Sequence, residues 1–129
     1  MTEKQVRKVI VEITTDPNAE REYELRHPDC LIDIPQSGER FDRDGMREVQ
    51  RNFPGGPPEM RLERLAGEGD VWVAELVSDY EDERGGLFNV CVILEFTDGR
   101  IVRETRYYAE PFEPPAGRAE WRLSAGTDL

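Results

Sequence analysis

The sequence has little positive charge with which to bind a polyanion. Only Lys4 and Lys8 are lysines, and the 17 Lys and Arg residues stand against 28 Asp and Glu residues, giving a formal net charge of −11. Nucleic acids and anionic membrane surfaces are bound through basic patches, so this balance argues against both as partners. The chain also lacks an apolar run near the roughly 20 residues that span a bilayer. We therefore expect a soluble protein with a self-repelling acidic surface.

Cysteine is scarce as well. Cys30 and Cys91 are the two cysteines, and each lies in an apolar stretch. Two cysteines so far apart exclude a disulfide scaffold, and neither has a second cysteine at metal-ligand spacing. We expect two buried, reduced thiols in a cytoplasmic protein, with no metal site and no cofactor.

The length limits the architecture. A chain of 129 residues with 37% hydrophobic residues fits one domain with one core, spanning 1–129 with a C-terminal tail from about residue 113. Charged residues make up 35% of the chain and the mean hydropathy is −0.69, which raises the question of disorder. The dense apolar segments after Asp70 favour a folded domain.

The first half of the chain is predicted to be mainly helical. Apolar residues at i, i+3, i+4 and i+7 predict an amphipathic helix over residues 3–14. A shorter helix should follow Asp16-Pro17, and a third should follow a cap at Asp42 or Asp44. Between the second and third helices we expect a turn at 27–29 and a short strand at 30–34. The apolar faces of the three helices are formed by Val6, Val9, Ile10 and Ile13, by Ala19 and Tyr23, and by Met46, Val49 and Phe53.

The second half is predicted to be an antiparallel meander. Segments 60–65, 71–80, 87–96 and 101–112 are rich in β-branched and aromatic residues. Asp98-Gly99 is the strongest hairpin signal and suits a type I′ turn. Helices followed by a long meander define the α+β class.

The last strands are apolar on both faces. Val90, Val92 and Leu94 alternate with Cys91 and Ile93, a pattern that a sheet with one solvated face does not show. One face should meet the helices, and a partner subunit is the natural cover for the other. We expect a homodimer that buries the face of Val90, Val92 and Leu94.

Three motifs carry a resemblance to a known family. They are His27-Pro28-Asp29-Cys30, the segment from Ile32 to Phe41, and Asp98-Gly99-Arg100-Ile101-Val102. In order and spacing they resemble the SnoaL-like branch of the nuclear transport factor 2-like superfamily, which includes polyketide cyclases. The resemblance implies a cone of three N-terminal helices packed in a curved antiparallel sheet, with an internal pocket for a small apolar or polycyclic molecule.

The hairpin register selects the side chains that should line this pocket. If Thr97 opposes Arg100 in a two-residue hairpin, directly opposed residues share a face. One face then combines Asn89, Cys91 and Ile93 with Glu104, Arg106 and Tyr108. In the cyclases that the chain resembles, the catalytic Asp lies on this last strand, and Arg106 occupies its position. We therefore assign the face of Glu104, Arg106 and Tyr108 to the pocket.

The resemblance leaves the reaction open. Arg106 cannot shuttle a proton near neutral pH, unlike an aspartate. Ketosteroid isomerases place an Asp just before a Pro on the first strand, whereas here Ile34 precedes Pro35 and Asp33 lies one position away. An acid/base role passes to Glu75 or Glu104, with Arg106 and Tyr108 stabilising an enolate-like oxygen. Glu75 is alternatively the partner of an arginine across the sheet, and Glu104 the partner of Arg106.

For several other side chains the sequence leaves both a functional and a structural role open. Trp72, Tyr80 and Tyr108 either stack on a flat ligand in the pocket or pack in the core. His27, the single histidine, is either a general base or a capping residue of its turn. Two hypotheses remain: an isomerase, cyclase or hydratase, and a non-catalytic ligand-binding or interaction module of the same fold.

Overall fold

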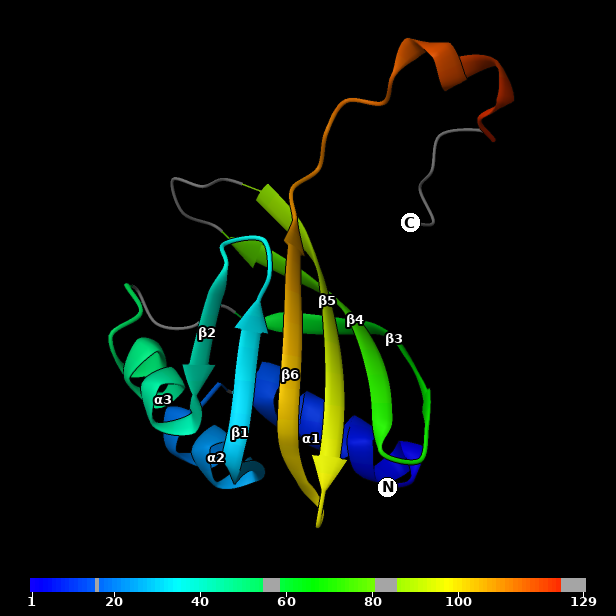
Figure 1. The fold of residues 1–129 in the computed structure, drawn as a ribbon. Helices are drawn as coiled ribbons and strands as arrows, with labels where there is room; N and C mark the ends of the chain where they lie inside the picture. The colour runs from blue at the N-terminus through cyan, green and yellow to red at the C-terminus, as the bar shows by residue number, and fades with distance from the viewer. Residues whose placement is uncertain (16, 55–58, 81–85, 124–129) are drawn as a thin grey trace.

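The computed structural model describes residues 1–15, 17–54, 59–80 and 86–123. Three helices precede and flank a strongly curved six-stranded sheet, and a short 3₁₀ helix follows it (Figure 1). The helices are α1 (Glu3–Thr15), α2 (Ala19–Leu25) and α3 (Arg43–Arg51), and the 3₁₀ helix is η1 (Ala116–Trp121). The strands are β1 (Arg26–Ile34), β2 (Glu39–Asp42), β3 (Met60–Glu68), β4 (Val71–Tyr80), β5 (Gly86–Thr97) and β6 (Arg100–Ala109).

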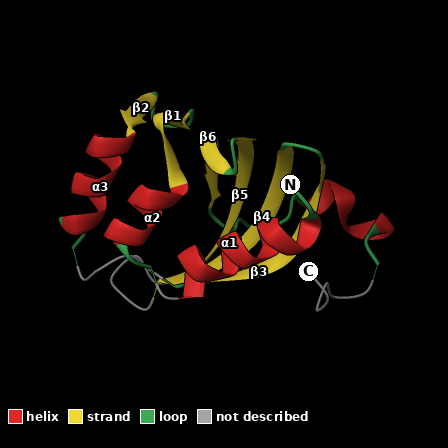
Figure 2. Cartoon of the chain, turned by 90° about the horizontal axis from the view of Figure 1, so that it is seen from below, coloured by secondary structure: helices red, strands yellow, loops and turns green. Residues whose placement is uncertain are grey.

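The strand order is β2-β1-β6-β5-β4-β3. Neighbouring strands are antiparallel except β1 and β6, which run parallel, so the sheet is mixed where we expected an antiparallel one. Seen from below, the helices line the concave side of the sheet: α1 lies along β3, and α2 and α3 lie beside β1 (Figure 2). This arrangement is the α+β cone predicted from the sequence.

Local sequence signals explain the helix starts. Asn18 caps α2 by accepting hydrogen bonds from the backbone N–H groups of Glu20 and Arg21, so this helix starts after Pro17 rather than at it. Asp42 caps α3 through the N–H of Gly45 at 2.7 Å. At the β5–β6 hairpin, Asp98 and Gly99 both have positive φ, as a type I′ turn requires.

A β-bulge changes the predicted register of that hairpin. Thr97 pairs with Arg100 as expected, but the register shifts by one between Glu95 and Phe96. Beyond the shift Leu94 opposes Glu104, Val92 opposes Arg106 and Val90 opposes Tyr108. Because a one-residue slip moves a strand's side chains to the opposite face, β5 presents the other set of residues to the helices.

The bulge therefore corrects the predicted dimer face. Val90, Val92 and Leu94 are at most 7% exposed and belong to the internal core. The outer, convex face carries Val73, Val77, Cys91 and Ile93, which are half-buried, and Tyr107, which is exposed. Over the described residues, no helix is long and apolar enough to cross a membrane.

The C-terminal segment leaves the sheet earlier than expected. Strand β6 ends at Ala109, two residues before Pro111, and the chain continues away from the body of the protein to η1 (Figure 1). Phe112, Trp121 and Leu123 are 78%, 76% and 92% exposed, so the predicted tail does not pack on the sheet or the helices.

We propose that the chain is a homodimer joined through the outer face of the sheet, in place of the face predicted from the sequence. Ile93→Arg should place a charge at the centre of this face and convert a particle of twice 14.9 kDa into one of 14.9 kDa. Sedimentation equilibrium at micromolar concentration measures the change. Val11→Arg on the exposed side of α1 is the control and should leave the mass unaltered. A wild-type mass of 14.9 kDa would refute the proposal.

Candidate functional site

A cavity of about 740 Å³ lies between the concave face of the sheet and the helices. Its wall is mainly apolar. The apolar side chains come from every layer of the fold: Ile10 and Ile13 of α1, Ile34 of β1, Met46 and Val49 of α3, Phe53, Met60 of β3, Leu76 of β4, and Phe88, Val90 and Val92 of β5. Apart from Thr14, the polar side chains gather in two places: a buried group of Glu22, Gln50, Glu104, Arg106 and Tyr108, of which Gln50, Arg106 and Tyr108 are half-buried, and an exposed group of Gln36, Ser37, Glu39 and Glu110.

The buried group is built around one carboxylate. Glu104 Oε1 accepts a hydrogen bond from Arg26 Nε at 2.8 Å, and Oε2 accepts two from Arg106, from Nε at 3.0 Å and Nη2 at 2.8 Å. The Glu104 and Arg26 side chains are each 1% exposed, and that of Arg106 is 14% exposed. Buried charges persist when they are paired and hydrogen-bonded, which this geometry provides.

These contacts set the charge of the group. Burial alone would raise the pKa of Glu104, but the two guanidinium groups outweigh it and bring the pKa down to about 2. Burial likewise acts to lower the pKa of Arg106, and Glu104 reverses the effect, so its pKa is raised. Glu104 is thus ionised and Arg106 protonated at neutral pH, and neither exchanges a proton there.

The pKa of Glu22 is shifted in the direction opposite to that of Glu104. It projects from α2, is 5% exposed and lines the cavity. Its Oε1 accepts a hydrogen bond from Gln50 Nε2 at 2.8 Å and lies 3.5 Å from Arg26 Nη2, while no described residue hydrogen-bonds its Oε2. Burial raises the pKa of Glu22 above its ordinary value of 4.5, although Arg26, Arg106 and Gln50 offset part of the rise. A cavity-lining carboxyl with a raised pKa and an unpartnered oxygen can accept a proton from a ligand or donate one to it.

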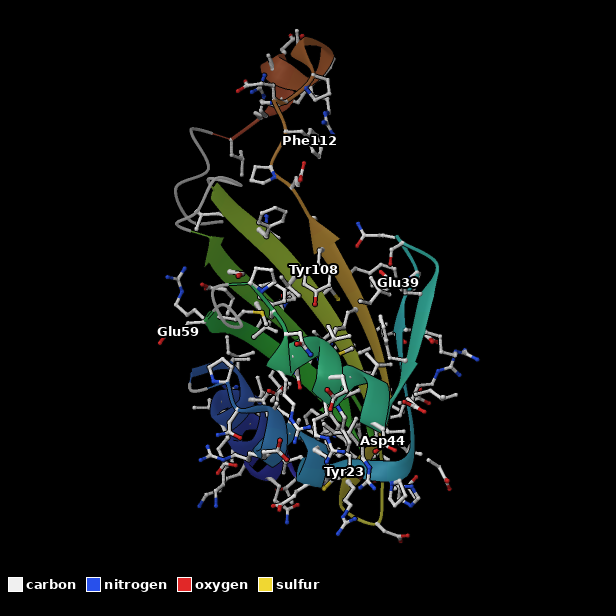
Figure 3. The ribbon with its side chains drawn as sticks, turned by 90° about the vertical axis from the view of Figure 1, so that its left-hand side faces the viewer. Tyr23, Glu39, Asp44, Glu59, Tyr108 and Phe112 are labelled. Atoms are coloured by element: carbon white, nitrogen blue, oxygen red, sulfur yellow. The ribbon has the colours of Figure 1, made fainter. Side chains whose placement is uncertain are left out.

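Tyr108 completes the polar wall. Arg106 Nη1 donates to the Tyr108 hydroxyl oxygen at 3.4 Å, which leaves the phenolic proton free to donate to a ligand. The Gln36 side-chain amide fixes the backbone here: its Nε2 donates to the Tyr108 carbonyl at 2.6 Å, and its Oε1 accepts from the Tyr108 N–H at 2.5 Å. Figure 3 shows Tyr108 on the helix-facing side of β6.

The sequence-based assignment of the last strand to the pocket agrees with this geometry. Glu104, Arg106 and Tyr108 line the cavity together. Arg106 pairs with Glu104, the structural alternative considered for that carboxylate. Ile34 also lines the cavity, whereas Asp33 lies on the other side of β1 and pairs with Arg40 and Arg103.

The other predicted pocket residues lie elsewhere. Glu75 projects from the outer face of β4 and forms a two-bond ion pair with Arg64, the structural alternative considered for it. Asn89, Cys91 and Ile93 are on the same outer face because of the bulge. Cys91 is therefore half-buried rather than buried, whereas Cys30 is buried and its pKa is raised to about 12 by burial; both thiols are free.

Trp72 and His27 both have the structural role that was considered for them. Trp72 is 5% exposed on the inner face of β4, and it packs in the core with its Nε1 donating to the Gly69 carbonyl at 2.8 Å. His27 Nδ1 accepts a hydrogen bond from the Asp29 N–H, as expected for a local capping role. The Tyr80 side chain lies outside the part of the chain that the structure describes in detail.

Sequence reasoning missed Glu22 and Gln50 of the buried group, and also Arg26, which pairs with Glu22 and Glu104. Glu22 and Arg26 stand four residues apart in the order that suits a helical ion pair, and Gln50 lies one turn of helix beyond Met46. Because Ala19 and Tyr23 were assigned to the inner face of the second helix, Glu22 was expected on its outer face. Tyr23 instead stacks against Arg43 and Arg47, whose guanidinium carbons lie 3.9 and 4.0 Å from its ring centroid. Within the described residues, no three His, Cys, Asp or Glu side chains are grouped to hold a metal ion.

Comparison with known proteins agrees with this architecture. The model of the SnoaL-like domain family matches residues 9–104, and the chain belongs to that family. No curated protein matches the sequence.

Solved structures give similar matches. A nuclear transport factor 2-like protein of unknown function from Burkholderia xenovorans is 30% identical, with a TM-score of 0.80 over 96% of this chain and 98% of that one. A protein from Kribbella flavida, provisionally described as a ketosteroid isomerase, is 25% identical, with a TM-score of 0.73 over 95% and 93% of the two chains. An epoxide hydrolase of the limonene type from Mycobacterium tuberculosis shares the fold, at 18% identity and a TM-score of 0.68 over 83% and 84%.

The shared carboxylate generates a stability prediction. Glu104→Gln leaves Arg26 and Arg106 buried without their counter-charge, and should lower the free energy of unfolding by about 3–5 kcal/mol. Glu75→Gln removes the same group from an exposed pair and should cost about 1 kcal/mol or less. Urea denaturation at pH 7 measures both, and equal costs for the two variants would contradict the prediction.

The Glu104→Gln and Glu75→Gln variants should also differ in how their free energy of unfolding depends on pH. Because the folded-state pKa of Glu104 is about 2 and its ordinary value is 4.5, its stabilisation is complete above about pH 4.5 and is lost as the pH falls toward 2. Glu104→Gln should remove this part of the acid-induced loss, and Glu75→Gln should retain it.

Proposed function

We propose that the protein is a small-molecule enzyme of the isomerase, cyclase or hydratase type, acting on an apolar or polycyclic substrate that carries a polarised oxygen. The observation that carries the proposal is the buried Glu22 side chain, which lines an apolar cavity together with Arg106 and whose Oε2 has no hydrogen-bond partner among the described residues. A carboxyl whose pKa is raised by burial is suited to proton transfer near neutral pH. This assigns the acid/base role to Glu22 in place of Glu75 and Glu104.

The oxygen of the substrate would lie against β6. The Tyr108 hydroxyl accepts from Arg106 and so can donate to that oxygen, and the Arg106 charge strengthens the donor as negative charge develops. Glu22 would remove a proton from the adjacent carbon and return it at another position. The Kribbella protein's description as a ketosteroid isomerase is consistent with such enolate chemistry.

A non-catalytic binding protein is the second candidate. It is favoured by the way in which Glu104 already neutralises Arg106 through two hydrogen bonds. In that case the cavity binds an apolar molecule and Glu22 accepts a hydrogen bond from it without moving a proton.

Hydrogen–deuterium exchange separates the two candidates without knowledge of the natural product. The wild-type protein should accelerate exchange of the α-protons of 1-tetralone in D₂O, followed by proton NMR. Glu22→Gln should lower the catalysed rate by about 10²- to 10⁴-fold, because the amide cannot accept the proton. Glu39→Gln, the same change at an exposed lining residue, should leave the rate within about twofold.

The result is decisive in both directions. Binding of 1-tetralone to the wild-type protein, measured by its chemical-shift changes, with exchange at the background rate would support the binding protein and exclude the enzyme. Equal catalysed exchange by the wild-type and Glu22→Gln proteins would remove Glu22 from the acid/base role.

A further inference from the structure

The ion group buried at the end of the cavity consists of two basic and two acidic side chains. Arg26 and Arg106 are positive, Glu104 is negative, and Glu22 is negative when ionised. Four further side chains around Glu22 add no charge. Gln50 of α3 and Tyr108 of β6 are neutral, the Thr14 hydroxyl of α1 donates to the Ile10 carbonyl, and burial holds the Cys30 thiol of β1 protonated. The nearby Arg43 and Arg47 of α3 are positive and half-buried: both stack on Tyr23, Arg43 donates to the Arg26 carbonyl, and Arg47 lies 3.9 Å from a Glu20 oxygen.

An anionic ligand would upset this balance. An uncompensated charge transferred into a buried site costs several kcal/mol, so an anion at Arg106 needs a compensating positive charge or the loss of a negative one. Glu104 cannot supply it, because two guanidinium groups hold this carboxylate in the ionised form. Glu22 can, because its Oε2 has no hydrogen-bond partner among the described residues and is free to take a proton.

Exposed carboxylates that line the cavity also disfavour anionic ligands. Glu39 and Glu110 are exposed lining residues, and the whole chain carries a net charge of −11. Their field disfavours the approach of anions and is indifferent to neutral molecules. Figure 3 places Glu39 at the same end of the sheet as Tyr108.

We propose that Glu22 determines the charge specificity of this pocket: neutral ligands bind directly, and an anionic ligand binds only together with one proton that Glu22 takes up. The proposal rests on the ligand pocket of the proposed function, but it concerns binding and does not require turnover. Its substrate class is the neutral, oxygen-bearing apolar molecule, with the free acid or sulfonate of the same skeleton discriminated against at neutral pH.

Two naphthalene probes test the proposal. 2-Naphthol is neutral from pH 5 to 8, and naphthalene-2-sulfonate is an anion throughout. The dissociation constant of 2-naphthol should be unchanged over this range. That of the sulfonate should rise about tenfold per pH unit above the pKa of Glu22, because one proton must be bound with each ligand. Isothermal titration calorimetry at several pH values gives both constants.

Two variants assign the proton. Glu22→Gln should remove the pH dependence of sulfonate binding and tighten it at pH 8, because the buried group then carries a net positive charge at every pH. Glu39→Gln removes an exposed carboxylate from the same cavity, so it should keep the full slope. Calorimetry of the wild-type protein in phosphate and in Tris counts the protons directly, and it should give one for the sulfonate and none for 2-naphthol.

Each result is decisive. Sulfonate binding with a flat pH profile, or equal proton counts for the two probes, would overturn the proposal while leaving the pocket intact. Should neither probe bind, the proposed function would fall together with the inference. If Glu22→Gln does not fold, the proton counts of the wild-type protein decide alone.

Discussion

The Glu104 carboxylate, shared by Arg26 and Arg106, is the interaction on which the rest of the structure depends. Arg26 stands where α2 ends and β1 begins, and Glu104 and Arg106 belong to the last strand of the sheet. The ion group therefore ties the helical layer to the sheet in the same place where the cavity has its polar wall. A purely apolar contact would join these elements as well, but it would leave the cavity without a charged end. Stability and binding chemistry are thus properties of one set of contacts.

The fold could be predicted because local signals agree with one another. The helical spacing of Val6, Val9, Ile10 and Ile13 predicted α1 to within one residue, and Asp98-Gly99 predicted the β5–β6 turn. The parallel pairing of β1 with β6 could not be read in the same way, because nothing local in either strand records a partner some 70 residues away. The expectation of a wholly antiparallel sheet was therefore wrong at this pair of strands.

The site could be predicted in part, for reasons that differ between strands and helices. Beyond the bulge the side chains of β6 alternate regularly, so Glu104, Arg106 and Tyr108 share the face that lines the cavity, as expected. The bulge adds one residue, Val102, to β6 opposite Glu95 and Phe96 without any sequence signal, so the β5 residues beyond it lie on the face opposite to the predicted one. In α2 charged residues were expected to be exposed. Glu22 and Arg26 are buried because Arg26 forms ion pairs with Glu22 and with Glu104, which is distant in the sequence.

The sequence separation within the ion group also has a consequence for how the chain folds. Arg26 and Glu104 are 78 residues apart, whereas β3, β4, β5 and β6 are joined as successive neighbours in the sheet. Closing a long loop costs more entropy than forming adjacent hairpins, so the meander should assemble before β1 docks on β6. On the ribosome, Glu22 and Arg26 emerge long before the carboxylate and guanidinium that neutralise them. The polar end of the cavity is therefore completed only when the final strand is in place, and a nascent chain without β6 has a core that cannot yet exclude water.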